Sequence, residues 1–308
     1  MSNKKENAVP GVIRVYRKLR FVLIPVVILV MGFSAYQAIR IFAEYGEGDE
    51  AYRSVDEQFV ITAPEAPSAA LPDLPVNPVT PEPTGEPAAA ETEEPADSQE
   101  QMPEATAQPQ SAETSPAAQP ERAPIAVDFS GLLALNSDCV GWIYIPDTKV
   151  SYPVMQSENN SKYLDRLPDG SQNKAGSIFM DFRNDPDLID GNIILYGHNM
   201  QNGSMFATLG KYAKRAFFDE HRTVYYLTPN GDYKVTVFAC ITVSPLGDSY
   251  EMYDDSDSLQ TYLKQIIKKA HVSAPVDTGR VNRIFTLSTC TEKRGTRIIL
   301  LGIPEKLG

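Results

Sequence analysis

The stretch Ile284-Phe285-Thr286-Leu287-Ser288-Thr289-Cys290, followed by Arg297-Ile298-Ile299-Leu300-Leu301, decides how this chain folds. Both runs are apolar and rich in β-branched residues, which predicts two buried strands. The residues between them, 291–295, are polar and predict a turn, so Cys290 is expected at the rim of a sheet. A thiol at a strand end with an arginine close behind suggests a nucleophile beside an anion-stabilising group.

Further extended runs with turn signals between them precede this pair. Because so many strands occur with few helices, the chain is predicted to form a mainly β fold, a mostly antiparallel barrel or sandwich. Helical spacing predicts a helix at 258–271 lying on the barrel, two short helices at 162–167 and 205–212, and one near 129–135 capped by Asp128 or Ser130. The eight predicted strands are 140–145, 150–155, 177–182, 192–196, 224–227, 233–243, 283–289 and 296–303.

An uncharged apolar run, 21–39, lies near the N-terminus. At about 1.5 Å per residue it spans roughly 28 Å, close to the thickness of a bilayer core. We therefore predict a cytoplasmic tail at 1–20 and a transmembrane anchor at 21–41. Basic residues precede the run and acidic residues follow it, which predicts an extracellular C-terminal part. A cleaved signal peptide is the alternative, but its apolar region is usually shorter, about 7–15 residues.

The chain has a net charge of −12, and residues 61–121 alone hold 12 acidic residues and no Lys or Arg. The rest of the chain is balanced and carries no basic stripe, so a nucleic-acid partner is not expected. Residues 61–124 hold 14 of the 24 prolines. We interpret 42–124 as a juxtamembrane segment, helical as far as about residue 60, followed by a disordered Pro/Glu/Ala-rich linker or stalk. The folded domain is predicted at 125–308.

Three cysteines and three histidines limit the candidates for catalysis. Cys139 and Cys240 lie in apolar surroundings and are interpreted as buried structural residues. His221 and His271 are interpreted as surface or helix-capping residues. His198, like Cys290, ends an apolar strand, so it is the candidate general acid and base that a cysteine nucleophile needs. No Cys or His spacing suggests a metal site, and no cofactor is expected.

Arg297 is the candidate oxyanion stabiliser, because a guanidinium is permanently charged and has several donors. Arg294 competes for this role. Arg297 is preferred because the strand that it begins fixes its direction.

With these residues in place, the chain resembles a class B sortase, one of the membrane-anchored cysteine transpeptidases of Gram-positive bacteria, over about 125–308. The resemblance to sortases rests on Thr-Leu-Ser-Thr-Cys at 286–290, Tyr-Gly-His-Asn at 196–199, and the arginine at 297. The N-terminal helical segment, the stretch Gly141-Trp142-Ile143-Tyr144-Ile145-Pro146 and the helix at 258–271 look most like class B. It implies an eight-stranded sortase-type β-barrel with Cys290 as nucleophile, His198 as general acid/base and Arg297 as stabiliser of the oxyanion and substrate. Ser288, Thr289 and Asn199 are candidate substrate-binding residues.

The resemblance also implies the reaction and its partners. Such an enzyme cleaves secreted proteins after the threonine of a Pro-x-Thr-type sorting signal. It passes the acyl group through a thioester to an amine of a peptidoglycan precursor or cross-bridge. The alternatives are a hydrolytic cysteine peptidase, a pilin-polymerising sortase and a non-catalytic, stalked surface-binding module. The long acidic linker departs from the usual class B pattern.

Overall fold

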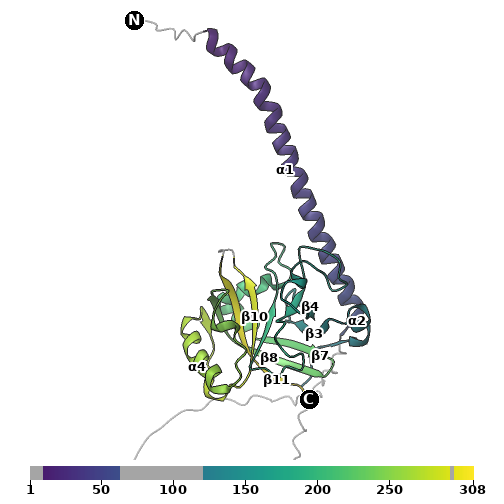
Figure 1. Ribbon diagram of the computed structural model, residues 1–308, viewed down its shortest axis with the longest axis vertical. Helices are drawn as coiled ribbons and strands as arrows, with labels where there is room; N and C mark the ends of the chain where they lie inside the picture. Colours follow the sequence, from purple (N-terminus) through teal and green to yellow (C-terminus); the bar gives the residue numbers. More distant parts are fainter. Residues whose placement is uncertain (1–9, 63–120, 292–294) are drawn as a thin grey trace, which may run out of the picture. The chain divides into compact units, whose positions relative to one another are not determined.

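The computed structural model describes residues 10–62, 121–291 and 295–308, and its C-terminal part forms a closed β-barrel (Figure 1). Hydrogen-bonded strands follow the order β11-β10-β6-β5-β4-β3-β7-β8, and an additional pairing of β8 with β11 closes the ring. The predicted eight-stranded barrel is confirmed. Its strands are β3 (Cys139–Tyr144), β4 (Ser151–Met155), β5 (Ile178–Met180), β6 (Asn192–Tyr196), β7 (Thr223–Thr228), β8 (Gly231–Val243), β10 (Ile284–Cys290) and β11 (Arg297–Lys306).

Most neighbouring strands are antiparallel, as expected, but β6 pairs with β10 and β4 pairs with β5 in parallel. The strand predicted at 177–182 is shorter than expected and ends at Met180. The cause is Asp181, whose carboxylate accepts a hydrogen bond from the backbone N–H of Arg183. Such side-chain bonds to the local backbone favour turns over strands.

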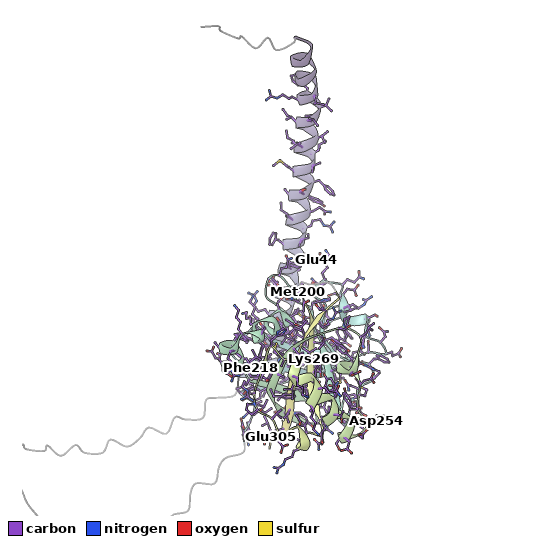
Figure 2. The ribbon with its side chains drawn as sticks, turned by 90° about the vertical axis from the view of Figure 1, so that its left-hand side faces the viewer. Glu44, Met200, Phe218, Asp254, Lys269 and Glu305 are labelled. Carbon is purple, nitrogen blue, oxygen red and sulfur yellow. The ribbon has the colours of Figure 1, made fainter. Side chains whose placement is uncertain are left out.

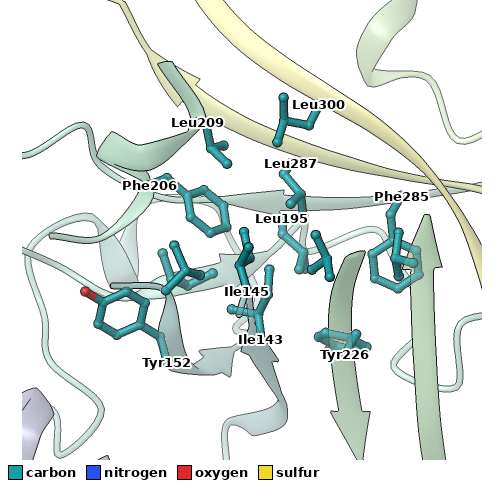
Figure 3. Packing of buried hydrophobic residues seen from close by; sticks show 14 of the residues in the cluster. Ile143, Ile145, Tyr152, Leu195, Phe206, Leu209, Tyr226, Phe285, Leu287 and Leu300 are labelled. Carbon is teal, nitrogen blue, oxygen red and sulfur yellow. The ribbon is translucent and has the colours of Figure 1, made fainter. Parts of the chain in front are cut away.

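Alternating apolar residues from these strands fill the barrel (Figure 3). Ile143, Leu195, Phe206 and Leu300 are fully buried in one cluster. Burying each such side chain contributes about 1.5–3 kcal/mol, which makes this cluster the main support of the barrel. A second buried cluster forms where helix α4 (Ser256–Ile266) covers strands β8, β10 and β11.

The helices agree with the predictions in position and differ at their ends. Helix α2 (Phe129–Leu135) is capped by Asp128, which accepts from the N–H groups of Ser130 and Gly131. Helix α4 begins at Ser256 because Asp255 caps it, and it continues as the 3-10 helix η4 (Ile267–Lys269). The other helical elements are η1 (Lys162–Leu164), η2 (Phe206–Ala213), α3 (Arg215–Glu220), η3 (Asp248–Tyr250) and η5 (Thr278–Arg280), and the short strand β9 (Val272–Ser273) pairs with β8.

Helix α1 (Pro10–Phe59) contains the predicted anchor and continues beyond it. By length and composition, its part from Leu19 to Phe59 is long and apolar enough to cross a membrane. The helix also extends through the region that we predicted to be helical after the anchor.

The end of α1 packs against the barrel, which the sequence did not indicate. Glu44, labelled in Figure 2 where the helix reaches the barrel, forms a 2.5 Å ion pair with Lys174. The buried Tyr52 donates from its hydroxyl to the carbonyl of Gly176 and packs edge-on against Tyr152. These contacts add the end of α1 to the compact unit that we expected to begin at residue 125.

Strand β1 (Val60–Thr62) follows α1 directly and pairs antiparallel with β2 (Ile125–Val127). Thr62 lies opposite Ile125, so the two flanks of the predicted linker are adjacent. The linker itself, apart from its flanks, lies outside the described residues, as do residues 1–9 of the predicted cytoplasmic tail and Arg294.

Candidate active site

Three neighbouring strands, β6, β10 and β11, bring the candidate residues to one end of the barrel. In the parallel pair of β6 and β10, Tyr196 lies opposite Ser288. His198 and Cys290 each follow two residues later, so the two chain segments reach the same end of the sheet. The antiparallel pair of β10 and β11 places Arg297 opposite Cys290. The backbone register therefore brings together the three positions that the sequence singled out.

A cavity of about 570 Å³ opens at this end of the barrel, and His198 and Arg297 both line it. A cavity of this size is typical of sites that bind small ligands or peptide segments. Its other described lining residues include both apolar and charged side chains. They are Asn160, Leu164, Phe179, Asp181, Phe182, Arg183, Tyr196, Gly197, Pro245, Leu246, Gly247, Tyr250, Glu251, Ser288 and Thr289.

One ring nitrogen of His198 is hydrogen-bonded to a backbone carbonyl. Its Nε2 lies 2.6 Å from the carbonyl oxygen of Leu164. Because a carbonyl oxygen only accepts, Nε2 carries the proton in this arrangement. In a neutral imidazole Nδ1 is then the basic nitrogen, so the ring is prepared to exchange a proton through Nδ1.

Arg297 is half-buried at the start of β11. Its Nη1 lies 3.4 Å from the carbonyl oxygen of Thr296, and the guanidinium forms no ion pair with the described acidic residues. The cation thus keeps donors available for an anion that develops in the cavity.

Two of the three predicted substrate-binding residues also line the cavity. They are Ser288 and Thr289, and Thr289 donates to the carbonyl of Gly197 at 2.8 Å. Asn199 pairs with Met205 in an isolated bridge and is not among the described residues that line the cavity.

Sequence reasoning missed an aromatic wall of the cavity. The hydroxyls of Tyr250 and Ser288 are 3.0 Å apart, and the Tyr250 ring stacks on that of Tyr196. Tyr196 ends β6 two residues before His198, so the alternation of an extended chain could have placed it on the same face as the histidine. Tyr250 ends the three-residue helix η3, which is too short to show a periodic pattern, so its role was not visible in the sequence.

The two other cysteines are structural, as predicted. Cys139 and Cys240 are buried free thiols. Burial raises the pKa of Cys139 to about 11 and that of Cys240 to about 12. Because the thiolate is the reactive form, both side chains are unsuited to nucleophilic attack near neutral pH.

The two other histidines lie away from the cavity. His221 follows α3, where its Nδ1 is 3.0 Å from the carbonyl of Phe217, so it caps the helix as predicted. His271 lies beyond η4 and pairs with the hydroxyl of Thr242 through Nε2 at 2.8 Å. Among the described residues, no group of three or more His, Cys, Asp or Glu is arranged to hold a metal ion.

Comparison with known proteins agrees with this geometry. Residues 143–304 match the family model of the sortase domain. A sortase B of Listeria monocytogenes is 39% identical over 166 residues, which cover 53% of this chain and 67% of that protein. A sortase B of Staphylococcus aureus is 33% identical over 166 residues, covering 53% and 68%. A solved Staphylococcus aureus sortase B–substrate complex has a TM-score of 0.54 at 30% identity, covering 58% of this chain and 85% of that one.

The chain therefore belongs to the sortase family of cysteine transpeptidases. The proteins named above are all sortase B, which confirms the class predicted from the sequence.

Proposed function

We propose that this sortase cleaves a Pro-x-Thr-type sorting signal after its threonine and transfers the acyl group to a cell-wall amine through a thioester on Cys290. The observation that carries the proposal is the register of β6, β10 and β11. It sets the positions of His198, Cys290 and Arg297 at one end of the barrel, beside a cavity large enough for a peptide segment.

In the first half-reaction, His198 takes the thiol proton of Cys290, the sulfur attacks the carbonyl carbon after the signal's threonine, and the carbonyl electrons move onto its oxygen. Arg297 stabilises this oxyanion with a permanent positive charge. The intermediate collapses when the C–N bond breaks and His198 gives a proton to the departing amine. A thioester remains on Cys290.

In the second half-reaction, an incoming amine attacks the thioester carbon while His198 takes its proton. The C–S bond breaks, the sulfur leaves and takes the proton back from His198, and a new amide bond joins the two partners. Two substrates thus react in turn on one enzyme, which gives ping-pong kinetics.

Similar proteins support the two classes of partner. The Staphylococcus aureus structure is a complex with substrate, and another solved sortase B, 30% identical to this chain, is complexed with triglycine. A peptide acyl donor and an amine acceptor are the partners that we propose here. Ser288 and Thr289 are proposed to contact the donor, since both line the cavity. Asn199 remains a prediction.

The apolar part of α1 supports a location at the cell membrane. We propose a single span with the N-terminus in the cytoplasm and the barrel outside the cell, because basic residues precede the span and acidic ones follow it.

The test is a library of Pro-x-Thr peptides offered to the purified protein with and without an amine acceptor. The expected result is a ligated product and a trapped thioester, both lost in Cys290→Ala. Cys240→Ala removes another thiol and is the matched control that should keep activity. Release of free acid alone at high acceptor concentration would instead identify a hydrolytic peptidase, and full activity in Cys290→Ala would overturn the proposal.

A further inference from the structure

A fully buried carboxylate lies in the wall of the cavity and has no part in the proposed chemistry. Asp181 follows β5, and its side chain is 0% exposed. It accepts from Arg183 through Nε at 2.8 Å and Nη2 at 3.0 Å, from the Tyr196 hydroxyl at 2.8 Å and from the Asn160 amide at 3.0 Å. A buried charge persists only when it is paired and hydrogen-bonded, and this one is both.

The balance of these effects keeps Asp181 ionised. Burial by itself raises the pKa of this carboxyl, but the hydrogen bonds from Arg183, Tyr196 and Asn160 outweigh it, so the pKa lies below its ordinary value. Tyr196 responds in the opposite sense, because burial and the neighbouring carboxylate raise the pKa of its phenol. Tyr196 therefore stays a neutral donor to a charged acceptor, and such charge-assisted bonds are the strong ones.

The donors to Asp181 come from three separate segments of the chain. Asn160 precedes η1, Arg183 lies in the turn after β5, and Tyr196 ends β6. All three line the cavity. Their only common partner among the described residues is the Asp181 carboxylate, which therefore fixes three parts of the cavity wall relative to one another.

The same network extends to Tyr250, which also lines the cavity. Arg183 Nη2 also donates to the carbonyl of Tyr250 at 3.0 Å, and the Tyr250 ring stacks on Tyr196. Arg183 is 39% exposed, and no described residue accepts a bond from its Nη1. The guanidinium is thus anchored on one edge and retains donors on the other.

We propose that Asp181 is a positioning residue for the acyl-donor peptide: its carboxylate holds Asn160, Arg183 and Tyr196 in the orientation in which they contact that peptide. This inference rests on the proposed function. It differs from a purely structural role in one measurable way. A residue that only stabilised the fold would change the unfolding temperature, whereas a positioning residue changes how well the peptide binds.

The test is Asp181→Asn in the full chain. The variant is assayed at saturating amine with the substrate peptide that the parent protein cleaves. Asparagine keeps the shape but loses the charge, and its NH₂ group cannot accept from Arg183 or Tyr196. We expect KM for the peptide to rise at least tenfold while kcat falls less than threefold, the pattern of lost binding that ground and transition states share. The rate of Cys290 labelling by a thiol reagent should be unchanged.

Asp138→Asn is the matched control. Asp138 also accepts from a cation and a tyrosine, Lys162 at 2.6 Å and Tyr163 at 2.7 Å, but neither donor lines the cavity. Its KM should stay within twofold of the parent. An unchanged KM in Asp181→Asn, or an equal rise in both variants, would overturn the inference.

Tyr196→Phe provides a second route if Asp181→Asn does not fold. It removes one donor and keeps the ring, so KM should rise several-fold, and an unchanged KM in this variant would contradict the inference. Failure here is distinct from failure of the proposed function. If the parent protein is active and the variants have an unaltered KM, only the proposed role of Asp181 is rejected. If the parent protein is inactive, the proposed function is rejected.

Discussion

Cys290 lies directly opposite Arg297 in the antiparallel register of β10 and β11. Opposed Cα atoms in such a pair are about 4.5–5.5 Å apart, so the pairing of the two strands holds the arginine beside the cysteine. Arg297 is therefore the arginine whose removal we expect to affect catalysis most.

Arg297→Lys should lower kcat by about 10²–10³-fold, the usual effect of losing one oxyanion donor. Lysine keeps the charge but not the planar fork of donors, so the fall in kcat reports the loss of donor geometry more than a change in net charge. The measurement is steady-state transpeptidation with a fixed peptide and amine. Arg280→Lys is the control, since Arg280 is exposed and, among the residues that the structure describes, forms an ion pair only with Asp277. Equal kcat values for the two variants would remove Arg297 from the mechanism.

Thiol chemistry should distinguish the three cysteines. In the native protein at pH 7.5 we expect one thiol to react rapidly with a disulfide reagent, and in denaturant all three. Burial excludes the reagent from Cys139 and Cys240 and raises their pKa to about 11 and about 12, so neither forms thiolate at this pH. Colorimetric titration gives the count. Cys290→Ala should show no rapid thiol in the native state, and a remaining rapid thiol would contradict the assignment.

The strands of the barrel were predictable because alternation of apolar residues is a local signal. Strand β6 has the bounds that the sequence predicts, and the predicted ends of β6 and β10 were enough to locate His198 and Cys290. That His198 and Cys290 lie at the same end of the barrel could be anticipated only in part. The sequence shows that both residues end strands, but not that the two strands are parallel neighbours.

Features that depend on distant partners were not predictable. Strands of three residues such as β1 and β2 carry no periodicity, and their pairing joins segments on either side of the linker. Asp181 looks like an ordinary acidic residue in the sequence, because two of the donors that compensate its burial come from other segments of the chain. The sequence placed Tyr52 in a juxtamembrane helix but did not indicate its hydrogen bond to the carbonyl of Gly176.

Shortening the linker should leave the barrel intact. Thr62 and Ile125 are partners in one strand pair, so a turn of a few residues can replace 64–119. A connection about ten times shorter lowers the loop-closure cost by about 2 kcal/mol. We expect an equal or higher unfolding temperature and peptide turnover within twofold of the parent.

Phe59→Ala is the comparison for the linker variant. It keeps the linker but removes a buried ring at the end of α1, at a cost of about 3–5 kcal/mol. Thermal unfolding and peptide turnover of both variants provide the measurement. A linker variant as unstable as Phe59→Ala would show that 64–119 contribute to the fold.

Acid should weaken the protein partly through Asp181. Its pKa in the folded state lies below the ordinary value, since the hydrogen bonds from Arg183, Tyr196 and Asn160 outweigh the effect of burial. A group of this kind adds stability above its unfolded pKa, about 3.9 for aspartate, and loses it as the pH falls through the folded pKa. The free energy of unfolding of the parent should therefore exceed that of Asp181→Asn at pH 7, and the difference should shrink below about pH 4. Urea unfolding at pH 7 and pH 3 measures both values.

Asp138→Asn should show a smaller change, because Asp138 and Lys162 are partly exposed and solvent screens their pair. A difference between parent and Asp181→Asn that is constant or grows toward pH 3 would contradict an ionised, hydrogen-bonded Asp181.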